Sequence, residues 1–225
     1  MGVQRRSNSN PALEGSRRWK NDLSDSLTMP ASAQALSRAP RQDNRREQLL
    51  DAAARLFRER GFHATSMRDI AKAVGMLSGS IYYHFDSKEE MLLAVYQEGE
   101  RRVAEAVDTA IAAESDPWQR LEAACAAHLG ALIAHRDYSQ VMIQTSPREA
   151  GTAEVRIRDL RRDYEQRFRR LIDDLTLPPD IDRHYLRLLL FGALNWSQVW
   201  YRIGGDSPEI VARRFLDTLR KQLEI

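Results

Sequence analysis

Side chains that could contact nucleic acid are concentrated in one short stretch of the sequence. The stretch contains Ser78, Gly79, Ser80, Tyr82, Tyr83 and His84. Small hydroxyls and a bare glycine backbone allow close approach to phosphates and base edges, and the aromatic hydroxyls can reach phosphate oxygens. For Tyr82 the alternative is that its ring only packs a small domain. Phe85, which follows, is expected to be a core residue.

The helix before this stretch has recognisable start and stop signals. Ser66 is followed three positions later by Asp69, the pattern of a hydroxyl cap with an acidic side chain reaching back. The apolar residues at helical spacing are Met67, Ile70, Ala71 and Val74. Gly75 can end the helix in a left-handed conformation, with Met76 and Leu77 filling the turn.

A second short helix is predicted from Ser78, carrying Ile81, Tyr82 and Phe85 toward the core. A capped helix, a glycine turn and a second short helix form a helix-turn-helix, whose second helix can enter the major groove of DNA. Asn44 can cap a preceding helix that runs to about Arg60 and packs over this motif. Asp86 or Ser87 caps a following long helix to about Ala113, which links the motif to the rest of the chain.

This stretch closely resembles the DNA-binding motif of TetR-family transcriptional regulators. The matching residues are Gly61-Phe62, Thr65-Ser66, Asp69-Ile70-Ala71, Gly75, Gly79-Ser80, Tyr82, His84-Phe85 and Ser87-Lys88-Glu89. The resemblance implies phosphate contacts from Ser66, Tyr82, His84 and Lys88, and base-edge or methyl contacts from Met76, Leu77, Ser78, Ser80 and Tyr83. Arg68, at the start of the preceding helix, is a further candidate for a phosphate contact.

Length and composition describe an ordinary globular protein. The 225 residues are 43% hydrophobic and 29% charged, with a net charge of +2, so bulk charge argues neither for nor against nucleic acid. The single cysteine, Cys125, fits a reducing compartment and is expected to be a buried, inert thiol. Without a secretory signal or a long apolar run, the expected location is the cytoplasm, with no membrane partner.

The chain is expected to divide into three parts. Residues 1–40 are rich in Ser, Asn, Ala, Pro and Arg and are predicted to be a disordered tail with a charge of +3. The tail is either an arm that strengthens DNA binding or a solvated extension, with Met29 as an alternative start. Residues 41–88 are the predicted DNA-binding domain, and residues 89–225 the predicted effector-binding and dimerisation domain.

The remaining sequence predicts helices and no strands, so the predicted fold class is all-α. The expected helices cover Trp118–His135, Asp137–Thr145, Ala153–Leu175, 182–203 and 208–223. Helix 182–203 is apolar nearly all round, which predicts that it is buried on more than one side. The family resemblance implies that helices 182–203 and 208–223 form the interface of a homodimer.

A ligand pocket is expected among the helices of the second domain. Its candidate residues are His128, Leu132, Met142, Tyr164, Phe168 and Trp196, each of which could instead be plain core. The arginine-rich helix 153–175 is expected to be an ion-paired face, with pairs such as Arg161–Glu165 and Glu165–Arg169. An arginine pocket for a ligand phosphate is the alternative.

The sequence gives no support for an enzyme, a metal site or a cofactor. It has no phosphate-binding glycine loop, no His-Glu-x-x-His motif and no paired cysteines. The histidines are scattered; His128 and His135, seven residues apart, form at most a weak metal-ligand pair.

The segments Met76–Met91 and Trp196–Gly205 are also similar to a TetR branch that represses fatty-acid or steroid catabolism genes and responds to acyl-CoA thioesters. This similarity implies a repressor that a small apolar effector, such as an acyl-CoA thioester, releases from a palindromic DNA operator. Two alternatives are a regulator that senses drugs or other small molecules and a constitutive DNA-binding protein without an effector.

Overall fold

The structure is a computed structural model that describes residues 39–223, and all of the regular elements in this range are helical, as predicted. The elements are α2 (Ala39–Arg60), α3 (Met67–Ala73), the 3₁₀ helix η1 (Ser80–Tyr83), α4 (Lys88–Ala112), α5 (Pro117–Ala134), α6 (Arg136–Gln144), the 3₁₀ helix η2 (Pro147–Ala153), α7 (Glu154–Asp173), α8 (Arg183–Trp200) and α9 (Pro208–Gln222). The predicted tail, residues 1–40, lies outside the described residues except for Ala39 and Pro40, where α2 begins. No helix in the described part of the chain is both long and apolar enough to cross a bilayer.

Local capping explains where most of these helices begin and end. Side-chain oxygens cap α3, α4, α5, α8 and α9; the capping residues are Ser66, Ser87, Asp116, Asp182 and Ser207. Each oxygen accepts a hydrogen bond from a first-turn N–H that has no partner within its helix. Gly61 and Gly75 have φ angles of +84° and +68°, which suit glycine, and they follow α2 and α3 as predicted.

Three predictions about element bounds were wrong. Asn44 does not cap α2 but lies inside it, where its side-chain oxygen accepts a hydrogen bond from Gln48 Nε2 at 3.3 Å. The second helix of the motif is only the four-residue η1, because the glycine and serines from Ser78 to Ser80 favour turns over α-helix. The helix expected to reach Ile203 ends at Trp200, because Tyr201 has an extended backbone.

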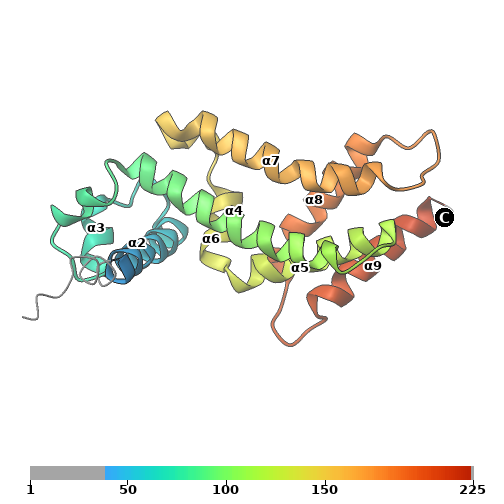
Figure 1. Cartoon of the computed structure of the whole chain (residues 1–225), viewed down its shortest axis with the longest axis horizontal. Helices are drawn as coiled ribbons and strands as arrows, with labels where there is room; N and C mark the ends of the chain where they lie inside the picture. The colour runs from blue at the N-terminus through green and yellow to red at the C-terminus, as the bar shows by residue number, and fades with distance from the viewer. Residues whose placement is uncertain (1–38, 224–225) are drawn as a thin grey trace, which may run out of the picture. The chain divides into compact units, whose positions relative to one another are not determined.

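Two hydrophobic cores meet along α4. The N-terminal half of α4, from Met91 to Tyr96, packs with α2, α3, η1, α6 and the start of α7. Its C-terminal half, with Val103 and Val107, packs with α5, α7, α8 and α9. Figure 1 shows α4 running from the end of the unit that carries α2 and α3 toward α5 and α9. A movement of α4 would therefore change the packing of both cores. The division into a DNA-binding domain that ends at residue 88 and a second domain that begins at residue 89 stays a prediction.

Helix α6 packs closely against α4 at Gly99. A Cβ atom added at Gly99 would lie 2.5 Å from Met142 Sδ and 3.2 Å from Tyr138 Cβ. We expect Gly99→Ala to lower the free energy of unfolding by about 1–3 kcal/mol, because overpacking displaces both neighbours. In the matched variant Gly130→Ala, the new Cβ would meet only Pro208 at 4.0 Å. The free energy of unfolding of that variant, measured by urea denaturation, should rise by up to about 1 kcal/mol. Equal effects of the two substitutions would contradict the close packing at Gly99.

Candidate functional site

The start of α3 is fixed by the capping box that the sequence predicts. The Ser66 hydroxyl accepts a hydrogen bond from Asp69 N at 3.2 Å and donates to Asp69 Oδ2 at 2.5 Å, and Ser66 N donates to the same carboxylate at 3.1 Å. These bonds from Ser66 hold the pKa of Asp69 below its usual value. Ser66 is exposed but its hydroxyl is engaged in the cap, so a phosphate would have to share it.

The η1 turn separates buried from exposed side chains. Ile81 and Phe85 are buried in the N-terminal core, as predicted for Phe85. Tyr82 does not pack toward the core as predicted; 54% of it is exposed, because a 3₁₀ turn has three residues per turn and points it away from Ile81. Leu77 and Tyr83 are 81% and 90% exposed, which is unusual for large apolar and aromatic residues.

The other predicted DNA contacts lie around this turn. Arg68, Ser78 and Gly79 are exposed, and Met76, Ser80, His84 and Lys88 are half-buried. The Lys88 ammonium donates a hydrogen bond to Phe62 O at 2.9 Å and lies 4.4 Å from the centre of the Phe62 ring. It therefore holds the loop between α2 and α3, a structural role that sequence reasoning missed. These exposed and half-buried residues around η1 are here called the η1 surface: Ser66, Arg68, Met76 to Ser80, Tyr82 to His84 and Lys88.

Polar contacts join the N-terminal helix α2 to α6. The Tyr138 hydroxyl donates to Asp51 Oδ1 at 2.7 Å, and Arg58 Nε donates to Asp137 Oδ1 at 2.6 Å. Tyr138 is buried; its burial and the Asp51 carboxylate raise the pKa of its hydroxyl. These four residues, here called the α2–α6 contact, were missed by sequence reasoning, because their partners are too distant in sequence to show a local pattern.

A cavity of about 160 Å³ lies among α4, α5, α6, α7 and α8. Its wall includes four of the predicted pocket residues, His128, Leu132, Met142 and Tyr164. Residues that were not predicted for the pocket also line it; Tyr96, Glu100, Leu160, Arg161, Phe191 and Asn195 are among them. An apolar space with a few polar groups is the usual form of a small-molecule site.

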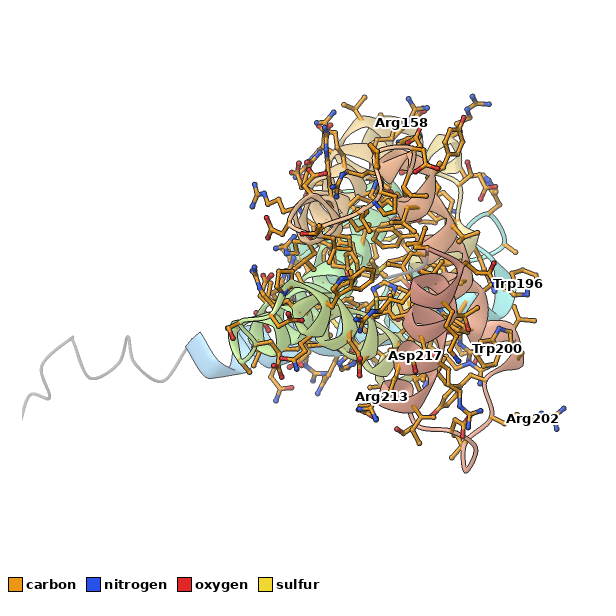
Figure 2. All side chains as sticks on the ribbon, turned by 90° about the vertical axis from the view of Figure 1, so that its right-hand side faces the viewer. Arg158, Trp196, Trp200, Arg202, Arg213 and Asp217 are labelled. Atoms are coloured by element: carbon orange, nitrogen blue, oxygen red, sulfur yellow. The ribbon has the colours of Figure 1, made fainter. Side chains whose placement is uncertain are left out.

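The other two predicted pocket residues lie elsewhere. Phe168 is fully buried behind the wall, where its ring packs edge-on against Phe191 with centroids 4.7 Å apart. Trp196 was placed in the pocket incorrectly: it is 65% exposed, and Figure 2 shows it projecting from the outer side of α8. Its neighbour Asn195 is the residue that turns toward the cavity, because adjacent positions on a helix lie about 100° apart.

A hydrogen-bonded chain of side chains forms the polar part of the cavity wall. His128 Nε2 lies 3.2 Å from Asn195 Oδ1, and His128 Nδ1 lies 2.6 Å from the Tyr164 hydroxyl. Since an amide oxygen can only accept, we assign the ring proton to Nε2, so that Nδ1 accepts from Tyr164. Burial lowers the pKa of His128 to about 4, so the imidazole is neutral at pH 7.

The neutral state of His128 makes stability depend on pH. The pKa of His128 is about 4 in the folded protein and near 6.5 when the ring is exposed, so below pH 6.5 the unfolded chain binds a proton that the folded chain does not. The free energy of unfolding should therefore fall by about 2 kcal/mol between pH 7 and pH 5 from this residue. Glutamine does not titrate, so between pH 7 and pH 5 the free energy of unfolding of His128→Gln should fall by about 2 kcal/mol less than that of the wild type. Urea denaturation at the two pH values measures both. Parallel losses in both proteins would contradict a buried neutral His128.

The arginine-rich helix α7 does not form the predicted pairs. Arg161 points to the C-terminal end of α6, and Glu165 pairs with Arg187 of α8 rather than with an arginine of its own helix. Tertiary partners have thus displaced these two pairs. The predicted ion-paired face is nevertheless present on α7, with the pairs Arg158–Glu154, Arg162–Asp159 and Arg169–Asp173. Cys125 is buried as predicted, and burial raises the pKa of its thiol. Among the described residues no cluster of His, Cys, Asp or Glu could hold a metal ion.

The outer face of α8 carries a row of exposed apolar residues. The row, here called the α8 stripe, consists of Tyr185, Leu189, Gly192, Trp196 and Val199. The spacings alternate between four and three residues, as in the contact seam of paired helices. Ile203, which follows the end of α8, is 94% exposed. A continuous apolar row of this size indicates a protein interface.

Comparisons with known proteins agree on one family. The profile described as bacterial regulatory proteins, tetR family, matches residues 49–95, and the profile of the tetracyclin repressor-like C-terminal domain matches residues 114–223. The HTH-type transcriptional repressor KstR2 of Mycolicibacterium smegmatis is 31% identical over 186 residues, covering 77% of this chain and 87% of that protein. The HTH-type transcriptional activator FasR of the same organism is 31% identical over 179 residues, covering 76% and 78%. The solved structure of the ketosteroid transcriptional regulator KstR2 of Mycobacterium tuberculosis superposes with a TM-score of 0.67 at 28% identity, covering 80% of this chain and 94% of that chain.

Proposed function

The chain belongs to the TetR family of bacterial regulatory proteins and is a ligand-responsive, DNA-binding transcriptional repressor, and we propose that a small apolar effector such as an acyl-CoA thioester releases it from a palindromic operator. The observation that carries the proposal is the η1 surface, where Leu77 and Tyr83 are exposed although large apolar and aromatic side chains are usually buried. A repressor of this kind would bind chromosomal DNA in the bacterial cytoplasm.

The proposed contacts divide the η1 surface by chemistry. Phosphate contacts come from the polar tips of Ser66, Arg68, Tyr82, His84 and Lys88, and base-edge contacts come from Met76, Leu77, Ser78, Ser80 and Tyr83. Gly79 between them has no side chain, which leaves space for the DNA backbone. Of these, the exposed side chain of Leu77 can only make apolar contacts, and the apolar group that the major groove offers is the thymine methyl.

Leu77 should therefore read a thymine. Leu77→Ala is expected to weaken operator binding about threefold to tenfold, which corresponds to the loss of one apolar contact. Replacing the contacted thymine with deoxyuridine should weaken the wild-type protein by a similar factor and leave Leu77→Ala unchanged. Fluorescence anisotropy with each thymine replaced in turn checks this double comparison. Additive losses at every thymine would contradict a methyl contact by Leu77.

We further propose that the protein binds its operator as a homodimer through α8 and α9. The α8 stripe supports this interface, and Gly192 in its middle allows two helices to approach closely. The exposed face of α9 is more polar, with Arg213 and Asp217 (Figure 2), and would form the rim. A two-fold dimer places its two η1 surfaces at a fixed separation, which matches an operator with two symmetric half-sites.

The proposed effector site is the cavity beside α4. Its apolar wall suits an acyl or steroid body, and the Asn195 amide beside His128 can bind a neutral oxygen such as a thioester carbonyl. A cavity of about 160 Å³ holds the acyl part, while the nucleotide part of CoA would extend outside it. Because α4 contributes to the cavity wall and to both cores, occupancy of the cavity would shift α4. This shift would change the separation of the two η1 surfaces in the dimer.

Binding to DNA from upstream of the protein's own gene tests the DNA-binding part of the proposal. We expect protection of two half-sites in a footprint, with an affinity that falls steeply as salt rises, because phosphate contacts release counterions. A shuffled duplex of the same composition is the control. Equal affinity for the two duplexes at every salt concentration would contradict specific binding of the protein to this region.

A further inference from the structure

Among the arginines of α7, the exposed Arg156 and Arg170 and the half-buried Arg161 form no ion pair with a carboxylate of the described residues. Arg158, Arg162 and Arg167 pair with Glu154, Asp159 and Asp108. Unlike Arg158 and Arg162, which are exposed, Arg161 is half-buried and lines the effector cavity. A partly buried cation without a counter-charge is costly unless another group neutralises it.

The two carboxylates of the cavity wall do not neutralise Arg161, because they pair with other arginines. Glu100 lies 3.7 Å from Arg167, and Glu165 pairs with Arg187. The cavity therefore has one cation in its wall that no acidic side chain in the described part of the chain matches.

The hydrogen bonds of Arg161 leave much of its guanidinium open. Its Nη2 donates to the carbonyl oxygens of Met142 and Thr145 and to the Tyr96 hydroxyl, at 3.2 Å for Thr145 and 3.1 Å for Tyr96. Toward the described residues, Nε and Nη1 donate no hydrogen bond. A guanidinium has five N–H donors, and a carboxylate or phosphate can accept two of them side by side.

The same guanidinium holds the C-terminal end of α6. The carbonyl of Met142 belongs to the last turn of this helix, and Thr145 is its C-cap, so neither carbonyl has a partner inside the helix. The Tyr96 hydroxyl also donates to Thr145 O, at 2.8 Å. Tyr96 and Arg161 together therefore supply donors and a positive charge where the helix dipole is negative.

The other end of α6 reaches the DNA-binding part of the chain. Its first turn carries Asp137 and Tyr138, which bind Arg58 and Asp51 of α2 in the α2–α6 contact. The short helix α6 thus has Arg161 at one end and α2 at the other.

We propose that the effector carries an anionic oxygen group that binds Arg161 and draws it away from the carbonyl oxygens of α6, so that this residue both selects an apolar anion and couples the cavity to α2. The inference rests on the proposed function of the cavity as the effector site. Without effector, Arg161 caps α6 and the α2–α6 contact is held. With effector, the anion takes the guanidinium, and α6 loses its positive cap. The ligand thus has different contacts in the two states, which is what a shift between them requires.

The test compares three ligands with the same eight-carbon chain by isothermal titration calorimetry. They are octanoate, octanoyl-CoA and 1-octanol, which carry a carboxylate, the phosphates of CoA and no charge. We expect at least one anion to bind more tightly than 1-octanol, and Arg161→Leu to weaken that anion about tenfold to a hundredfold, since one charge-assisted pair is lost. Binding of octanoate would identify a carboxylate as the anion, and binding of octanoyl-CoA alone would identify a CoA phosphate.

Arg158→Leu is the matched control, because Arg158 is an exposed arginine of the same helix (Figure 2). It should leave all three affinities unchanged. If 1-octanol binds the wild type as tightly as the anions, if neither anion binds, or if Arg161→Leu affects the anions no more than Arg158→Leu does, the proposal is wrong. Should Arg161→Leu fail to fold, Arg161→Lys keeps the charge but loses the bidentate geometry and should still weaken the anion severalfold.

Hydrogen exchange tests the coupling without DNA. The bound anion should raise amide exchange in α6 of the wild type, and Arg161→Lys should show raised exchange in α6 before any ligand is added. Unchanged exchange in both cases would refute the coupling role. Specific operator binding together with anion binding that ignores Arg161 would refute this inference alone. Arg161-dependent anion binding without binding to any operator would instead refute the proposed function.

Discussion

Trp196→Glu is expected to convert the protein from a dimer to a monomer and to weaken operator binding roughly a hundredfold to ten-thousandfold. The substitution places a charge in the middle of the α8 stripe on both subunits, where the proposed interface would bury it without a partner. Each monomer could then read only one half-site, and the gain from simultaneous binding of two half-sites is lost. Light scattering after size-exclusion chromatography gives the mass, and fluorescence anisotropy gives the affinity.

Val155→Glu is the matched control for this substitution. Val155 is 68% exposed on α7, outside the α8 stripe, so a glutamate there adds the same charge without touching the proposed interface. It should remain dimeric with normal affinity for the operator. A dimeric Trp196→Glu protein, or a Val155→Glu protein that also dissociates, would contradict the α8 interface.

Gly79→Glu is expected to weaken operator binding by at least about a hundredfold without lowering the melting temperature. Gly79 has ordinary helical φ and ψ angles, and an added Cβ would meet no atom within 4 Å, so the folded protein tolerates any side chain there. On DNA, the new carboxylate would face phosphates, and such like-charge contacts cost several kcal/mol.

Thr109→Glu adds the same charge to the exposed last turn of α4, away from the η1 surface. It should reduce operator affinity little, because at physiological salt a distant charge is largely screened. A Gly79→Glu protein that binds the operator normally would show that η1 does not face the DNA. A matching loss in Thr109→Glu would mean that net charge, rather than position, controls binding.

Local signals account for the parts of the fold that the sequence predicted well. The caps at Ser66 and Ser87 depend on hydrogen bonds within four residues, so the residue types themselves carry the information. The existence of α8 and α9 follows in the same way from apolar spacing along one helix, although α8 is less buried in the single chain than predicted, with Tyr185 and Trp196 exposed. The η1 turn was predicted too long, because Phe85 and Ile81 suggested a helical face that glycine and serine do not sustain.

Contacts between distant segments were not predictable from local patterns. Arg161 and Glu165 have the spacing of a helical ion pair, but Tyr96 and the end of α6 attract the arginine, and Arg187 attracts the glutamate. Trp196 and Asn195 are neighbours in sequence, and only the packing of α8 decides which of them faces the cavity. The α2–α6 contact likewise exists only once α6 is placed beside α2.

The most direct test measures the affinity of the wild-type protein for its footprinted operator with and without a saturating acyl-CoA thioester. Two thioesters are used, one with a long acyl chain and one with a steroid-like acyl group. Free CoA is the control. We predict that at least one thioester lowers the affinity tenfold to a hundredfold, which corresponds to a coupling free energy of about 1–3 kcal/mol, while free CoA has no effect. If both thioesters bind the protein and the operator affinity stays the same, occupancy of the cavity does not control DNA binding, and the proposed effector mechanism is wrong.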